Sequence, residues 1–221
     1  MVYSDTRCTR LIRATARQQW KLLALHLGRI GRSLERGRSQ KLLEAYDALP
    51  SKMSEILSMD AQMKRIGEKY CQSPAALYLG RHFNYPTALE GALKNKEISY
   101  MHSDGFPAGE MKHGPIALID ERMPVVTIAP VDDVFEKMIG NMQEVKARGG
   151  SVIALTTRGD TKLASFLDPV TDFILAVPRA PALLTPIVMT LPLQLLAYDI
   201  AVRRGCDVDQ PRNLAKSVTV E

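Results

Sequence analysis

The sequence predicts an α/β protein, a three-layer sandwich with a parallel sheet covered by helices on both faces and preceded by an α-helical segment. Beyond Ser73 and Pro74, short apolar runs alternate with stretches long enough for a helix or a turn, an order typical of βαβ units. Hydrophobic residues make up 46% of the chain and charged residues 24%. This is the composition of a folded domain rather than of a disordered chain.

Four apolar runs have the length of buried strands and are bounded by turn residues. A fifth, more polar strand is expected near Met101–Ser103 to complete a five-stranded sheet. Because parallel sheets bind ligands outside the carboxyl ends of their strands, the loops after these strands are where a site is expected. The four apolar strands are predicted at Ala75–Gly80, Pro124–Pro130, Ser151–Thr156 and Asp172–Val177.

Helical spacing of apolar residues between Thr9 and Tyr70 predicts an all-helical segment before the sheet. Further helices are expected at Pro86–Tyr100, Asp132–Arg148 and Leu183–Arg204. The residues after Gly205 have no periodic pattern, although several are apolar, so we expect a tail that packs against the domain. The predicted organisation is a helical segment over 1–70, a sheet domain over 71–206 and a tail over 207–221.

The net charge of +5 is concentrated near the N-terminus, where ten of the 29 Lys and Arg residues precede residue 42. Arg10, Arg13, Arg17 and Lys21 form one basic helical stripe that could contact phosphate. A solvated helix face is the favoured interpretation, because aromatic residues and a recognition motif are absent from this segment. We therefore predict no nucleic-acid partner.

Three cysteines, Cys8, Cys71 and Cys206, are an odd number without metal-ligand spacing. They suggest neither a disulfide framework nor a zinc site, and they fit a reducing cytoplasm. The longest apolar stretch, Pro181–Tyr198, contains three prolines and Gln194. We interpret it as a buried helix rather than a membrane span.

The predicted helix Pro86–Tyr100 carries the candidate chemistry. At 100° per residue, Glu90, Lys94 and Glu97 fall within about 60° of one another on one face. Leu89 and Leu93 lie beside Glu97, and partial burial there would suit a carboxylate that takes and gives a proton. Periodicity alone describes a surface ion pair equally well, and that is the more common arrangement.

Two further residues could take part in proton transfer or carbonyl chemistry. His113 lies between Gly109 and the Gly114-Pro115 turn, and an imidazole titrates near neutrality. Lys216, near Arg212 in the tail, could be a carbonyl-reactive amine if it is buried. Taken alone, the histidine is more often structural and the lysine more often solvated.

Three long segments carry a resemblance to a known family. They are YPTALEGALKNKEISY (85–100), AGEMKHGP (108–115) and DVDQPRNLAKSVTVE (207–221). In this order they resemble the glutamine–fructose-6-phosphate aminotransferases (isomerizing), also called glucosamine-6-phosphate synthases, from about Ala48 to the end. Those enzymes have a glutaminase domain and two sugar-isomerase (SIS) domains, and this chain is similar to the second SIS domain with its tail.

The resemblance implies a flavodoxin-like SIS sheet and gives roles to the candidate residues. Glu97 matches the glutamate that moves a proton between C1 and C2 of the sugar. His113 matches a histidine that assists ring opening across a dimer interface, and Lys216 matches the lysine that engages the sugar carbonyl. The remaining implied substrate contacts are Lys94, Glu90, Ser4 and Ala215.

The implied reaction converts fructose 6-phosphate and glutamine to glucosamine 6-phosphate and glutamate, without metal or organic cofactor. The implied partners are these sugar phosphates and a second copy of the chain, in the cytoplasm and without a membrane. The family's catalytic cysteine after the initiator Met is replaced by Val2, and its Ser/Thr-rich phosphate loop is missing. We therefore expect little activity from the chain alone. A sugar-phosphate-binding module without catalysis, or a truncated product without function, are the alternatives.

Overall fold

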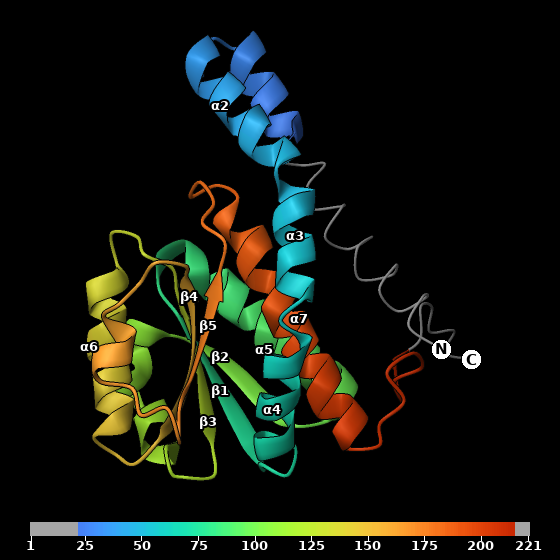
Figure 1. Ribbon diagram of the computed structural model, residues 1–221, viewed down its shortest axis with the longest axis vertical. Helices are drawn as coiled ribbons and strands as arrows, with labels where there is room; N and C mark the ends of the chain where they lie inside the picture. Colours follow the sequence, from blue (N-terminus) through green and yellow to red (C-terminus); the bar gives the residue numbers. More distant parts are fainter. Residues whose placement is uncertain (1–21, 215–221) are drawn as a thin grey trace. The chain divides into compact units, whose positions relative to one another are not determined.

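Alternation of strands and helices after residue 73 produces a doubly wound parallel sheet. The structure, a computed structural model, describes residues 22–214 (Figure 1). All strands pair in parallel, in the order β2-β1-β3-β4-β5. The strands are β1 (Ala75–Gly80), β2 (His102–Pro107), β3 (Pro124–Ala129), β4 (Ser151–Thr157) and β5 (Phe173–Val177).

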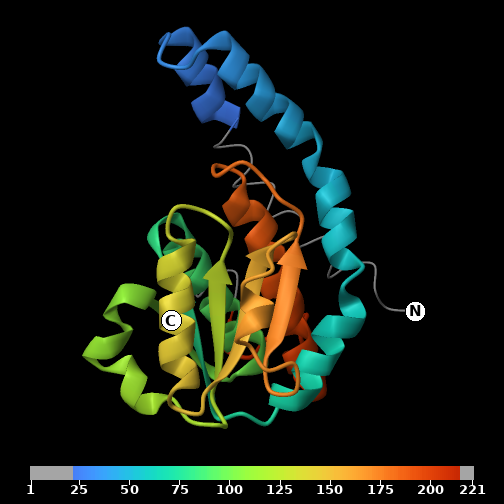
Figure 2. The same ribbon diagram turned by 60° about the vertical axis from the view of Figure 1, so that its left-hand side comes forward.

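Helices cover both faces of this sheet, which confirms the predicted three-layer sandwich. On one face lie α4 (Asp60–Tyr70), α5 (Tyr85–Ser99) and α7 (Thr185–Arg203), and on the other lies α6 (Phe135–Lys146) (Figures 1 and 2). Four short 3-10 segments complete the connections. They are η1 (His82–Asn84), η2 (Ala108–His113), η3 (Pro115–Leu118) and η4 (Leu163–Ser165).

The chain divides into two compact units, Met1–Lys52 and Met53–Glu221. In the described part of the first, residues 22–30 are helical and α2 (Arg36–Asp47) follows a turn in which Arg32 has φ +54°. Helix α3 (Leu49–Leu57) begins in the first unit and ends in the second. The predicted helical character is confirmed for the described residues before β1, while the basic stripe from Arg10 to Lys21 lies outside them.

Strand β2 is longer than the sequence predicted, since it runs over six residues from His102 rather than over Met101–Ser103. It pairs only with β1 and forms one edge of the sheet. An edge strand leaves part of its surface in water and therefore tolerates polar residues such as His102 and Asp104. The other strands and the three later helices begin and end within three residues of the predicted positions.

Helix α5 packs closely on both β1 and α7. A Cβ atom on Gly91 would lie 2.8 Å from the end of the Leu193 side chain of α7 and 3.1 Å from the Tyr78 ring of β1, so a larger residue there would require these side chains to shift. On the opposite face, α6 and η2 share a second apolar core with the sheet. Its members include Leu77, Leu79, Met111, Val125, Phe135, Met138 and Met142.

Helix α7 is long and apolar enough to cross a membrane by length and composition, but 67% of its apolar window is buried inside the protein. It packs against α4 and α5. This burial is typical of the core helix of a folded domain and agrees with the predicted buried helix.

Candidate active site

Helix α5 carries three of the candidate residues, Glu90, Lys94 and Glu97. The helix begins beside Pro86, which fits the first turn because its missing N–H would have no helical partner. It ends where Tyr100 takes a left-handed conformation with φ +57°. Its inward face is lined by Thr87, Ala88, Gly91, Ala92, Asn95 and Ser99.

Lys94 and Glu97 form a partly buried ion pair on α5. The Lys94 ammonium donates to a Glu97 carboxylate oxygen over 2.5 Å. The two side chains are only 12% and 24% exposed, so water screens the pair less than it screens an ordinary surface pair. Glu90 lies one turn earlier and is also partly buried. The structure therefore pairs Lys94 with Glu97 and has Glu90 one turn earlier on the same helix, as the helical spacing predicted.

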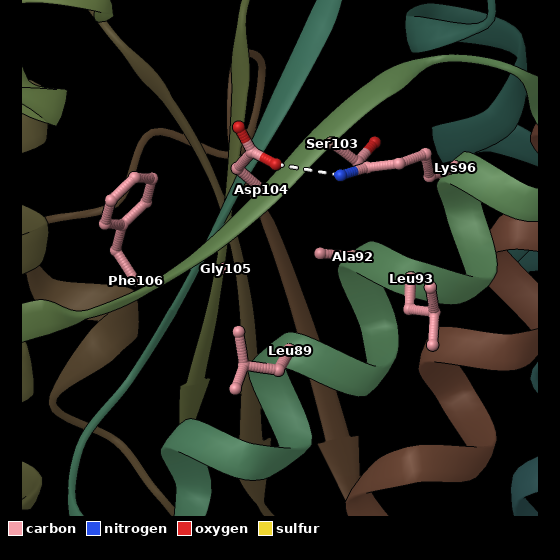
Figure 3. A pocket seen from close by; sticks show the side chains of 8 residues that line it. All are labelled: Leu89, Ala92, Leu93, Lys96, Ser103, Asp104, Gly105 and Phe106. Carbon is pink, nitrogen blue, oxygen red and sulfur yellow. Dashed lines mark hydrogen bonds and ion pairs between the residues drawn. The ribbon is translucent and has the colours of Figure 1, made fainter.

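Lys96 points away from this group, as its place in the helical pattern predicts. Its ammonium pairs with Asp104 on β2 over 2.9 Å. This pair lies at an open groove of about 510 Å³ between α5 and β2, where Leu89, Leu93 and Phe106 supply apolar surface (Figure 3). The hydrogen bond from Lys96 lowers the pKa of the Asp104 carboxyl.

The tail runs past the end of α5 that carries Glu97. The Cys206 thiol donates to the Ser99 carbonyl over 3.7 Å, and the Arg212 N–H donates to the Tyr100 hydroxyl over 2.8 Å. The described part of the predicted tail therefore contacts the domain at Arg212, whereas the apolar Leu214 is 54% exposed and does not pack as predicted. Ala215 and Lys216 follow within four residues of Arg212 but lie outside the described residues, as does Ser4.

His113 is on the other layer of the domain. It ends η2, whose Ala108 and Met111 are fully buried in the core shared with α6. Its imidazole is 76% exposed, and its ion-pair partner in the described chain is Glu110, at 3.8 Å. Because α5 covers the opposite face of the sheet (Figure 2), one copy of the chain does not bring His113 to the Lys94–Glu97 pair.

Two hydrogen bonds between side chains of this protein lie at the carboxyl ends of β1 and β3. Arg81 donates to Asn141 of α6 over 2.9 Å, and Asn84 donates to Asp132 over 3.0 Å. The sequence indicated these loops as ligand sites but did not single out the four residues. For Arg81, Asn84 and Asp132, a polar character within a few residues of the end of a buried strand was the available signal, whereas Asn141 lies inside α6 and gave none. No cluster of metal-ligating side chains occurs within residues 22–214.

Comparison with known proteins identifies the sheet unit. Residues 69–204 match the model of the SIS domain. The chain is 52% identical over 200 residues to a glutamine–fructose-6-phosphate aminotransferase (isomerizing) from Thermus thermophilus and 50% identical over 201 residues to one from Aquifex aeolicus. These alignments cover 90% and 91% of this chain but 32% and 33% of the relatives. The chain thus spans about a third of their length.

A solved structure supports the same comparison. The C-terminal domain of a glucosamine-fructose-6-phosphate aminotransferase from Francisella tularensis superposes with a TM-score of 0.80 at 35% identity. The superposition covers 86% of this chain and 52% of the Francisella chain. The fold, including its five-stranded parallel sheet, is therefore shared with a domain of a sugar-phosphate aminotransferase.

Proposed function

The chain belongs to the SIS domain family, and from this premise we propose that it is the isomerising part of an enzyme that makes glucosamine 6-phosphate and glutamate from fructose 6-phosphate and glutamine. The observation that carries the proposal is the partly buried Lys94–Glu97 pair on α5, beside the described part of the tail. Relatives that are named for this reaction are identical to this chain at about half of the aligned positions. Because the match covers a third of those relatives, the complete reaction requires parts of the enzyme beyond it.

In the proposed reaction, Glu97 carries a proton between C1 and C2 of the open-chain sugar. A carboxylate suits this step because it can take the proton from one carbon and return it to the next. Lys94 orients the carboxylate and neutralises its charge when no proton is bound. Glu90, Ser4 and Ala215 are proposed substrate contacts.

Lys216 is proposed to engage the sugar carbonyl with its amine. The tail is held at Tyr100, three residues after Glu97, and Lys216 follows four residues after Arg212. Such a lysine and Glu97 would act on adjacent carbons of one substrate. No metal or organic cofactor is proposed for these steps.

His113 is proposed to assist ring opening in a second copy of the chain. An imidazole can exchange a proton with a ring oxygen near neutral pH. Its place on the layer opposite α5 favours donation to another copy over a role beside its own Glu97. We therefore propose a cytoplasmic homodimer, without nucleic-acid or membrane partners.

The test measures conversion of fructose 6-phosphate to glucose 6-phosphate. The chain is assayed alone and mixed with the Thermus thermophilus relative shortened by the region that matches this chain. We expect little turnover alone, measurable turnover in the mixture, and its loss in Glu97→Gln. Turnover by the chain alone that Lys216→Ala abolishes would overturn the expectation of low intrinsic activity. Micromolar binding of glucosamine 6-phosphate by calorimetry, without turnover in either assay, would favour the non-catalytic module.

A further inference from the structure

Four polar side chains connect the loop after β1 to η2 through helix α6. Arg81 donates to the Asn141 amide oxygen over 2.9 Å, and the Asn141 amide nitrogen donates to Glu144 over 3.4 Å. The second oxygen of Glu144 pairs with Lys112 over 2.8 Å. We call Arg81, Asn141, Glu144 and Lys112 the α6 network.

The central residue of the α6 network, Asn141, is buried and acts as both a hydrogen-bond acceptor and a donor. Asn141 is 5% exposed, and its amide accepts from Arg81 while it donates to Glu144. Burial alone would raise the pKa of the Glu144 carboxyl, but hydrogen bonds from Lys112 and Asn141 outweigh it and leave the pKa below its usual value. Because Asn141 is buried, its amide would be costly to leave without partners, and it fixes the geometry at the centre of the network. The Glu144 and Lys112 side chains are 27% and 61% exposed, so their ion pair is weaker.

The α6 network also contacts the backbone of η2. A Cβ atom on Gly109 would lie 3.3 Å from a terminal nitrogen of Arg81, so the guanidinium packs against the start of the segment. Lys112 is held near its end. The two attachments lie on either side of the buried Met111, which anchors the inner face of η2 in the core.

His113 follows Lys112 directly and has few contacts that would fix it. Its imidazole is 76% exposed, and its partner Glu110 belongs to the same short segment. The next residue, Gly114, has φ +153°, a conformation that glycine adopts far more readily than other residues, so the chain turns away immediately. The orientation of His113 therefore depends on how firmly the end of η2 is held.

We propose that Asn141 is a positioning residue for the isomerisation, which acts through Glu144 and Lys112 to fix η2 and the direction in which it presents His113. The contribution of Asn141 to the reaction rests on the proposed function. The claim that the α6 network holds η2 in place is independent of the proposed function. Asn141 itself touches no substrate in this scheme.

The first test is hydrogen exchange of residues 108–113 in the full 221-residue chain, followed by mass spectrometry. We expect exchange to accelerate about tenfold in Asn141→Leu and about threefold in Lys112→Met. In these variants some hydrogen bonds of the network are missing, so local opening of η2 costs less free energy. Lys162→Met is the matched control, since it removes an exposed ion pair to Glu136 on the same helix and leaves the α6 network intact. It should leave exchange of this segment unchanged.

Conservative substitution at Glu144 separates hydrogen bonding from general damage. Glu144→Gln retains one oxygen, which can accept from Lys112 or from Asn141, whereas Glu144→Leu retains none. We expect Glu144→Gln to keep part of the protection that Glu144→Leu loses. If Asn141→Leu fails to fold, Lys112→Met still tests the proposal. Lys112 is 61% exposed, so its replacement should leave the core of the domain intact. Exchange within about twofold of wild type in Lys112→Met and Glu144→Leu would overturn the proposal.

The second test uses the mixture assayed for the proposed function. We expect Asn141→Leu to lower kcat about tenfold and to change KM less than about twofold, because the proposed scheme gives His113 a role in ring opening rather than in holding the sugar phosphate. Faster exchange with unchanged kcat would reject the positioning role. An absence of turnover in wild type as well would instead count against the proposed function, while the exchange experiment still decides whether the network holds η2.

Discussion

The guanidinium carbon of Arg212 lies 4.3 Å from the ring centroid of Tyr100, whose hydroxyl also accepts the hydrogen bond from the Arg212 N–H. This double contact fastens the tail to the residue that ends α5. Because Glu97 is in the last turn of that helix, the contact joins the two parts of the chain to which the proposed mechanism assigns proton transfer and carbonyl chemistry.

Replacement of Tyr100 should loosen the tail. Tyr100→Leu removes the hydrogen bond and the cation–π contact, together worth about 1–2 kcal/mol, while Tyr100→Phe removes only the hydrogen bond. We expect trypsin to cut after Arg212 roughly tenfold faster in Tyr100→Leu and a few-fold faster in Tyr100→Phe. Equal cutting rates in the three proteins would show that this contact does not hold the tail.

Removal of the Glu97 carboxylate should abolish most of the turnover measured in the mixture assay. General acid–base catalysis contributes about 10²–10⁴-fold, so Glu97→Gln should lower kcat within this range without unfolding the protein. Lys94→Met should lower it by about tenfold, because the carboxylate loses its orienting partner.

Lys96→Met is the control for this pair of variants. It removes a neighbouring lysine of the same helix that pairs with Asp104 and points away from Glu97. Its kcat should stay within about twofold of wild type. A loss as large as that of Lys94→Met would mean that total charge on α5, rather than the Lys94–Glu97 geometry, supports turnover.

Asp172 should be the most sensitive carboxylate for stability. Its side chain is 1% exposed, pairs with Lys146 over 2.8 Å and accepts the N–H groups of Val152 and Asp168. Asp172→Asn leaves Lys146 without its counter-ion, and we expect a loss of about 3 kcal/mol in the free energy of unfolding by urea. Asp60→Asn, which breaks an exposed pair with Lys64, should cost less than about 0.5 kcal/mol.

Tyr78 should make stability fall at alkaline pH. Burial raises the pKa of its phenol far above the ordinary 10.0, and the nearby Asn95 amide lowers this pKa by a smaller amount. Above pH 10 the unfolded chain releases this proton and the folded chain keeps it, so the free energy of unfolding should drop by about 1.4 kcal/mol per pH unit from this group. Below pH 10 the contribution is constant.

The measurement compares wild type with Tyr78→Phe in urea between pH 9 and pH 11. Other tyrosines titrate in both proteins, so the difference between the two slopes isolates Tyr78. We expect the Tyr78→Phe curve to fall less steeply above pH 10. Parallel curves would mean that the Tyr78 hydroxyl ionises in the folded protein.

The sequence predicted the sheet because buried parallel strands are continuous apolar runs. It located α5 because Pro86, the helical spacing and Tyr100 agree on one helix. The predicted strand at β2 was too short, because the polar residues His102 and Asp104 interrupt the apolar run by which a buried strand is recognised. Ser4, Ala215 and Lys216 stay predictions, as do the roles of Glu90, Lys94, Glu97 and His113.

Long-range polar pairs were beyond sequence reasoning. Arg81 and Asn141 are 60 residues apart, and Asn84 and Asp132 are 48 apart. Their meeting depends on the order of strands and on the face over which each connection crosses, neither of which local patterns specify. For the same reason, the sequence could not place His113 on the layer opposite α5.

The packing of α7 against both α4 and α5 has a consequence for synthesis of the chain. The layer that bears Glu97 cannot be closed until Arg203, the last residue of α7, has been made. Until then, the apolar faces of α4 and α5 are exposed on a growing polypeptide, a situation that favours chaperone binding or aggregation. The proposed catalytic layer would therefore be among the last parts of the domain to become native.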